Sequence, residues 1–172
     1  RGALRRRRRV IVRQLTGDDT AAYRELHRFG MSESPTGFVD VAETDAARSD
    51  AQVRDMLQQG HGWGAFDGDR LVAKLTIDAL PYPSLAHTFW IHAVYAHPDA
   101  RGTGASGKLI QAAIEGARLK GALRVALWVN GVNAHARGLY ERMGFSQTGR
   151  IPGGIEVAGA YVDDVLMTLE LA

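Results

Sequence analysis

The sequence contains no cysteine, which excludes disulfide bonds, thiolate metal ligands and a cysteine nucleophile. It also lacks any apolar run near the ~18 residues of a membrane-spanning helix, so we expect no membrane segment. No apolar stretch follows the basic first residues, and we expect no secretory signal peptide. The remaining class is a globular cytoplasmic protein, for which 172 residues are enough to bury a core.

Positive charge is concentrated at one end of the chain. The first nine residues, RGALRRRRR, include six arginines, Arg1 and Arg5 to Arg9. Without these arginines the net charge changes from +2 to about −4, because 15 basic residues then face 19 acidic ones. An arginine run can bind nucleic acid, but the basic charge does not continue into residues 10–172, so we do not expect a nucleic-acid-binding protein. We predict that residues 1–9 are a disordered arm or a processing remnant and that 10–172 form one domain.

Hydrophobic periodicity predicts a mixed α/β order of elements. Strands are expected at 10–15, at 87–98, at 123–130, at 145–151, at 160–171 and in a hairpin over 62–80 that turns at Asp67, Gly68 and Asp69. Helices are expected at 16–31, 44–60, 104–121 and 133–144, with a loop at 32–43. The strand, helix and strand at 88–130 form a parallel unit, whereas the preceding hairpin is antiparallel. We therefore predict a mixed, twisted sheet of about seven strands with helices on both faces.

One loop, RGTGASGKL at residues 101–109, matches three phosphate-binding patterns. As G-x-x-x-x-G-K it resembles a P-loop, but Leu109 stands where a Mg²⁺-binding Ser or Thr is required, and the later apolar strand ends in Asn130 instead of Asp. As G-x-G-x-x-G it is a dinucleotide fingerprint, but no acidic residue lies between Glu115 and Glu141 to bind a ribose. Both of these interpretations lack an essential partner residue.

The third pattern, R-x-x-G-x-S, requires less. Backbone N–H groups that lead into a helix N-terminus bind a pyrophosphate without a metal. Gly102 and Gly104 allow the backbone to approach the anion closely, and Arg101 and Lys108 add positive charge. A glycine-rich turn without any ligand is the alternative, because short motifs often match by chance.

Two longer stretches favour the third pattern. HPDARGTGASGKLI, preceded by the strand WIHAVYA, and NAHARGLYERMGFSQTG resemble successive core segments of the GNAT superfamily of acetyl-CoA-dependent N-acetyltransferases. The resemblance extends over about residues 10–171; Ser106 departs from the usual Gly or Ala at its position. It implies the GNAT fold, acetyl-CoA as co-substrate, no metal, and an amine on a small molecule or a protein as the acetyl acceptor. A homodimer is compatible with it.

The resemblance also implies where the coenzyme binds. The pantetheine arm pairs with the long strand at Val94, Tyr95 and Ala96, in a V-shaped opening between 88–97 and 123–130. The pyrophosphate contacts, made mostly by backbone amides, fall on the loop residues Arg101, Gly102, Thr103, Gly104, Ala105, Ser106 and Gly107. Asn133 matches an asparagine that contacts the coenzyme. It also suits a helix N-cap, and both roles can hold together.

Tyr140 matches the general acid of the family, which protonates the departing thiolate. A phenol stays protonated at neutral pH and can donate to a thiolate; a tyrosine that only packs is the alternative. The general base is less defined, because Trp90 and Trp128 occupy positions where relatives carry glutamates. His92 lies on the same strand face as Trp90 and can accept a proton directly or through water. A half-buried strand histidine with an ordinary hydrogen bond is the alternative.

Three histidines, His87, His92 and His97, recur every five residues, but we do not expect a shared metal. In a strand, neighbouring histidines of this set are roughly 16 Å apart and alternate between faces.

The acceptor pocket implied by the family lies at about 29–45 and 151–161. Those acceptor segments carry Glu33, Asp40, Glu43 and Glu156, with Arg150 at their edge. We therefore predict a cationic or amine-bearing small molecule as acceptor. A non-catalytic acyl-CoA-binding or sensor module on the same fold is the alternative function.

Overall fold

A computed structural model describes residues 10–34 and 42–171, without the side chains of residues 42–44. The predicted arm at 1–9 lies outside the described residues. The helices are α1 (Thr20–Glu33), α2 (Ala42–Ala47), α3 (Asp50–Gln58), α4 (Ala105–Leu119) and α5 (Ala134–Arg142), with short 3-10 helices η1 (Gly17–Asp19), η3 (Pro83–Leu85) and η4 (Pro98–Ala100). The strands are β1 (Ile11–Gln14), β2 (Gly62–Asp67), β3 (Arg70–Ala79), β4 (Thr88–Ala96), β5 (Arg124–Asn130), β6 (Ser146–Val157) and β7 (Ala160–Glu170).

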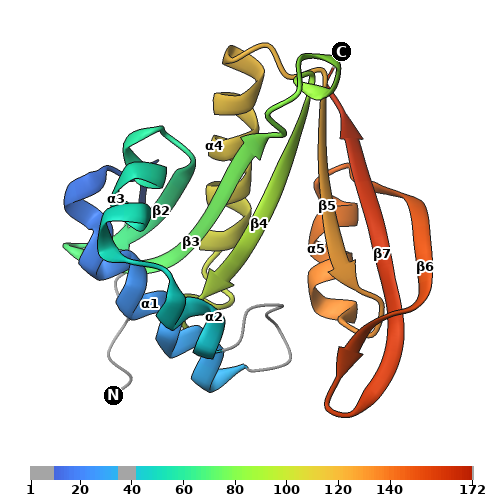
Figure 1. The fold of residues 1–172 in the computed structure, drawn as a ribbon, viewed down its shortest axis with the longest axis horizontal. Helices are drawn as coiled ribbons and strands as arrows, with labels where there is room; N and C mark the ends of the chain where they lie inside the picture. Colours follow the sequence, from blue (N-terminus) through green and yellow to red (C-terminus); the bar gives the residue numbers. More distant parts are fainter. Residues whose placement is uncertain (1–9, 35–41, 172) are drawn as a thin grey trace, which may run out of the picture.

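The strands form one seven-stranded sheet in the order β1-β2-β3-β4-β5-β7-β6. Neighbouring strands are antiparallel except for β4 and β5, which are parallel because α4 carries the chain back between them. Figure 1 shows α1, α2 and α3 on one side of the sheet and α4 and α5 on the other. The predicted mixed sheet of about seven strands with helices on both faces is thus confirmed. No helix in the described part of the chain is long and apolar enough to cross a membrane.

Each face of the sheet has its own apolar core. On one face α4 packs residues such as Leu109 and Ile110 against the inward side chains of β3, including Leu75. On the other face α1 and α3 form a smaller cluster that includes Tyr23 and Leu57. Since side chains alternate along a strand, the intervening β3 residues face α1 and α3. The α1 side of the sheet therefore includes polar side chains of β3, such as Lys74, besides the apolar cluster.

Two predicted boundaries were wrong. The single helix expected at 44–60 is two helices, α2 and α3, because Ser49 starts a new one. Its side chain accepts the N–H of Gln52 at 3.2 Å, and the Gln52 side chain accepts the N–H of Ser49 at 2.8 Å. This reciprocal capping box is a strong helix start. Similarly, β6 continues to Val157 instead of ending at residue 151, because it keeps pairing with β7 beyond a local irregularity.

Strand β4 has two irregularities that shape the molecule. It pairs with β5 only over Thr88–Trp90, and beyond this point the two strands spread apart (Figure 1). Further along, the register with β3 shifts at a β-bulge, where Ala93 has a positive φ of 51°. Ile91 faces the α4 core before the bulge and Tyr95 faces the α1 core after it. The bulge therefore reverses which residues of β4 point to each face.

Candidate active site

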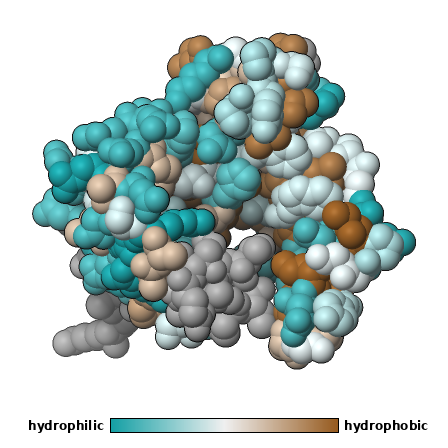
Figure 2. All heavy atoms as spheres, viewed as in Figure 1, coloured by the Kyte–Doolittle hydropathy of each residue, from teal (hydrophilic) through white to brown (hydrophobic). Residues whose placement is uncertain are grey.

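A cleft of about 790 Å³ lies where β4 and β5 separate. In the space-filling view this face of the molecule is hollowed between its two halves (Figure 2). The cleft brings together several residues that the sequence singled out and others that it did not. The first group includes His92, Val94, Trp128, Asn133 and Tyr140, and the second includes Asp164. The predicted V-shaped opening therefore exists in the structure.

The glycine-rich loop joins η4 to the first turn of α4. Gly102 and Gly104 have positive φ values of 72° and 82°, and a Cβ added to either, or to Gly107, would meet no atom within 4 Å. The loop is exposed up to Gly104, which is the N-cap of α4. Ala105 is buried, and its N–H is 3.3 Å from the Thr103 hydroxyl. The backbone thus presents an open, anion-compatible helix N-terminus, which suits the pyrophosphate of acetyl-CoA.

The side chain of Arg101 is already engaged. Its guanidinium forms a fork with the Glu33 carboxylate, with N–O distances of 3.0 and 2.6 Å, and its Nε donates to the Ala96 carbonyl at 3.2 Å. The arginine holds the pKa of Glu33 below its ordinary value. The Tyr95 hydroxyl donates to the same carboxylate at 2.9 Å, and burial and this carboxylate raise the pKa of Tyr95 to about 12. Arg101 and Tyr95 therefore tie α1 to the loop, and neither side chain lines the cleft.

Tyr140 is nearly buried, at 6% exposure, and lines the cleft from α5. Its ring packs edge-on against Phe145 at a centroid distance of 5.8 Å. Burial raises the pKa of Tyr140 to about 12, so its phenol keeps its proton throughout the neutral range. Tyr140 is thus both packed against Phe145 and part of the cleft wall.

His92 projects from β4 into the cleft and meets a carboxylate that sequence reasoning missed. Its Nε2 is 3.3 Å from one oxygen of Asp78, and Nδ1 of His61 is 3.7 Å from the other. Asp78 lies on β3 and also lines the cleft. The sequence shows Asp78 on a predicted strand, but only the register between β3 and β4 places it beside His92.

Asn133 is the N-cap of α5, where its side-chain oxygen accepts the N–H of Ala136 at 3.0 Å. The predicted capping role is confirmed, and Asn133 also lines the cleft. Trp128 lines the cleft as well and is 42% exposed. An aromatic surface therefore occupies this part of the β5 wall.

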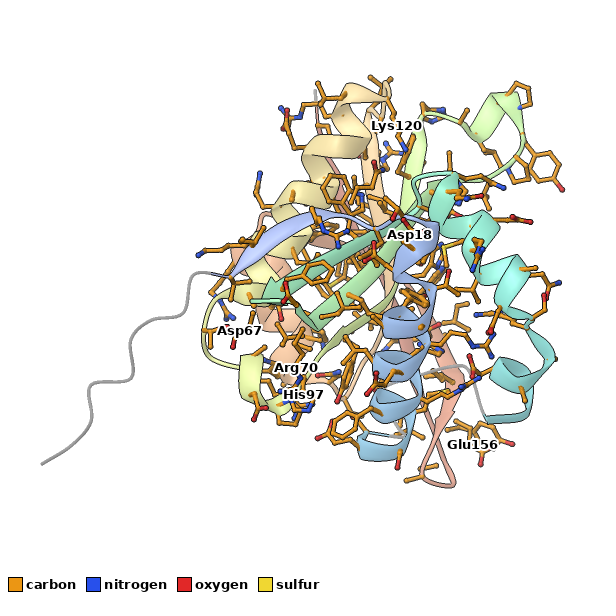
Figure 3. All side chains as sticks on the ribbon, turned by 90° about the vertical axis from the view of Figure 1, so that its left-hand side faces the viewer. Asp18, Asp67, Arg70, His97, Lys120 and Glu156 are labelled. Atoms are coloured by element: carbon orange, nitrogen blue, oxygen red, sulfur yellow. The ribbon has the colours of Figure 1, made fainter. Side chains whose placement is uncertain are left out.

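Of the acidic residues predicted to line the acceptor pocket, the two whose side chains are described, Glu33 and Glu156, do not line the cleft. Glu33 binds Arg101, and Glu156 is not among the lining residues and lies near the far end of the β6–β7 hairpin (Figure 3). Asp40 and the side chain of Glu43 lie outside the described residues. A different set of aspartates lines the cleft, Asp45, Asp78 and Asp164.

These aspartates differ in their partners. Asp45 is paired with Arg24 at 3.6 Å and Arg28 at 3.0 Å, which joins α2 to α1. Burial raises the pKa of Asp164 above its ordinary value. Arg48 is the one Lys or Arg among the described lining residues, so the charge excess of the cleft is negative. In the described part of the chain no three His, Asp or Glu side chains converge in a way that would hold a metal ion.

Comparison with known proteins agrees with this geometry. The model of the acetyltransferase (GNAT) family matches residues 20–145, which include α1, β4, the glycine-rich loop and α5. The chain belongs to the GNAT acetyltransferase family. Members of this family use acetyl-CoA.

The individual relatives match either part of the chain or the whole chain at low sequence identity. L-methionine sulfoximine/L-methionine sulfone acetyltransferases from Pseudomonas aeruginosa and Pseudomonas paraeruginosa are 36% identical over 80 residues, and the match spans 46% of this chain and 46% of each relative. A GNAT acetyltransferase from Streptococcus pneumoniae has a TM-score of 0.82 at 19% identity, over 95% of this chain and all of that one. A putative acetyltransferase from Salmonella typhimurium, solved with acetyl-CoA, has a TM-score of 0.81 at 19% identity, over 95% of both chains.

Proposed function

We propose that this protein transfers an acetyl group from acetyl-CoA to a primary amine, by direct attack of the amine in a ternary complex. The observation that carries the proposal is the opening between β4 and β5, with Tyr140 on one wall and His92 on the other. Bound acetyl-CoA would supply an activated thioester. The chain's own residues would hold it, exclude water and move two protons.

Binding is assigned to the backbone. The loop from Gly102 to Gly107 and the N-terminus of α4 would receive the pyrophosphate, because open space surrounds the glycines of the loop and the helix dipole favours an anion there. Val94 and Ala96 on the free edge of β4 would pair with the pantetheine arm, and Asn133 contributes from the opposite wall. Side-chain identity matters little for such contacts, which is consistent with the engagement of Arg101 by Glu33.

Proton transfer is assigned to two side chains. A protonated amine cannot attack a thioester, so a base must first take its proton. His92 is suited to this because Asp78 can orient its ring and stabilise the imidazolium that forms. Tyr140 would then give its proton to the sulfur as the C–S bond breaks. These are roles for groups that line one cleft, and no metal is needed for either.

We further propose that the acceptor is a small amine without excess negative charge. Asp78 and Asp164 favour a cationic group in the cleft, and Trp128 offers an exposed aromatic surface for its body. The relatives from Pseudomonas are named for amino-acid derivatives, which supports a small-molecule acceptor. A protein amino group is the second candidate.

The function is tested by incubating the protein with acetyl-CoA and a panel of amines while free thiol is measured. The panel should contain polyamines, arylalkylamines, L-methionine sulfoximine, a peptide with a free N-terminus and an anionic amine such as glutamate. We expect amine-dependent thiol release that is greatest with neutral or cationic small amines. Binding of acetyl-CoA without turnover on any amine would instead identify a non-catalytic module, and preference for glutamate would contradict the charge argument.

Replacing His92 with Gln should lower kcat/KM by about tenfold to a hundredfold at pH 7, the low end of general-base loss because water can substitute. The deficit should shrink at pH 9, where more of the amine is already deprotonated in solution. Asp78→Asn should show a smaller deficit with the same pH trend, since it acts through His92. Steady-state rates across this pH range check the result. A deficit that is the same at both pH values would assign His92 to packing or acceptor binding.

A further inference from the structure

Lys74 on β3 is completely buried, which is uncommon for a lysine. Its side chain faces the α1 side of the sheet, where Nζ lies 4.5 Å from the centre of the Tyr23 ring. Burying this group costs desolvation and side-chain entropy that a leucine would not incur. The cost is offset only if Nζ has specific partners, and one of them is in the active-site cleft.

That partner is the bulge of β4. Nζ of Lys74 donates to the Ala93 carbonyl at 3.2 Å. The carbonyl belongs to the residue that interrupts the regular pairing, between the pairs Thr76 with His92 and Lys74 with Tyr95. With its φ of 51°, Ala93 has a left-handed conformation that is unfavourable for an L-residue. The lysine therefore helps to hold an irregular conformation that the strand would not adopt by itself.

The same contact determines where the next N–H points. The Ala93 carbonyl and the Val94 N–H belong to one planar trans peptide, so they point in opposite directions. By holding the carbonyl, Lys74 therefore also fixes the direction of the Val94 N–H. Ala93 and Val94 both line the cleft, on the edge of β4 that β5 has left. A cationic donor on the carbonyl also polarises the peptide and strengthens its N–H as a donor.

We propose that Lys74 is a positioning residue that aims the Val94 N–H at the carbonyl oxygen of the acetyl thioester. This inference rests on the proposed function. As the amine nitrogen bonds to the carbonyl carbon, negative charge develops on that oxygen, and a pre-oriented N–H stabilises it. The charge returns as the C–S bond breaks and the thiolate takes a proton from Tyr140. Lys74 contacts neither substrate and acts only through the peptide.

The first test separates turnover from binding. Lys74→Met shortens the unbranched side chain by one atom and removes the donor, and we expect kcat to fall about tenfold to a hundredfold. Complete loss of an oxyanion donor costs about 10²–10³-fold, and here the donor remains but is less well aimed. The dissociation constant of acetyl-CoA should stay within about twofold of the parent value, because other amides hold the coenzyme. If the methionine variant does not fold, Lys74→Gln replaces it in the same measurements; because its amide can still donate a hydrogen bond, we then expect a smaller fall in kcat.

Lys120→Met is the matched control. Nζ of Lys120 also donates to a backbone carbonyl, that of Gly60 at 3.3 Å, but at the end of α4 far from the loop (Figure 3). We expect its kcat to equal that of the parent. A parallel fall of kcat, coenzyme affinity and Tm in the Lys74 variant would mean a purely structural role and would overturn the proposal.

The second test is spectroscopic and needs no acceptor. The carbonyl stretch of ¹³C-labelled acetyl-CoA should move to lower frequency on binding to the parent protein, because the Val94 N–H polarises the bond. In Lys74→Met it should move back toward the value in solution. A parent that does not bind acetyl-CoA would end the proposed function and this inference with it. A parent that binds and shows the shift, with a Lys74 variant that retains it and its kcat, would overturn the inference alone.

Discussion

Replacing Tyr140 with Phe should lower kcat by about 10²–10⁴-fold, the range typical of a lost general acid. The change keeps the ring and its packing against Phe145 and removes only the proton that the residue can donate. Acetyl-CoA affinity should change little, because the loop and β4 supply mostly backbone contacts. Since burial raises the pKa of Tyr140 to about 12, we also expect no alkaline loss of rate from its deprotonation up to mildly alkaline pH.

The matched control is Tyr82→Phe, which removes a hydroxyl from a tyrosine that is 61% exposed and does not line the cleft. Turnover and coenzyme affinity are measured together on both variants. A turnover of Tyr140→Phe within about threefold of the parent, well short of the range for a lost acid, would end the assignment. Water at the exposed side of the cleft can replace the phenol in part, which would move the result toward the lower bound.

Replacing Gly104 with Val should weaken acetyl-CoA binding by more than about tenfold, ~1.4 kcal/mol. No atom of the protein lies within 4 Å of an added Cβ, so the fold has room for one. The branched side chain would occupy the open space above the loop, where the pyrophosphate is proposed to bind. The positive φ of Gly104, 82°, also disfavours a β-branched residue, so we expect the protein to lose about 1–2 kcal/mol of stability.

Gly121→Val separates these two effects. Gly121 has a similar φ of 88° and equally open surroundings, but it follows α4 at the end opposite the loop. The two variants should lose similar thermal stability, and only Gly104→Val should lose coenzyme affinity in a titration with acetyl-CoA. Equal affinities in both variants and the parent would show that the loop is not the phosphate site.

Much of the site is encoded in contiguous residues and could be predicted. Gly102 and Gly104 mark a turn into a helix, and the segment from Asn133 to Tyr140 is one short helix whose cap and register are local properties. The order of strands followed from period-two patterns and from a parallel unit that needs a helix between its strands. These features depend on neighbours in the chain, so the sequence alone determined the fold class, the family resemblance and the position of the proposed acid.

Other features depend on contacts between distant segments, and only the tertiary structure decided them. Nothing in the apolar run of β4 marks the bulge at Ala93, because alanine and valine both occur in regular strands. The register of β4 with β3 places Asp78 beside His92, and the bulge brings the Ala93 carbonyl to Lys74.

Likewise, the sequence indicated only that Arg101 adds positive charge beside the loop, whereas in the structure Glu33, far away in sequence, binds its side chain from the end of α1. Charge pairing across elements requires their relative placement, which local periodicity does not contain. Sequence therefore located the proposed co-substrate loop and the proposed acid, whereas packing between β3, β4 and α1 determined the histidine's partner, the bulge and the acidic lining of the cleft.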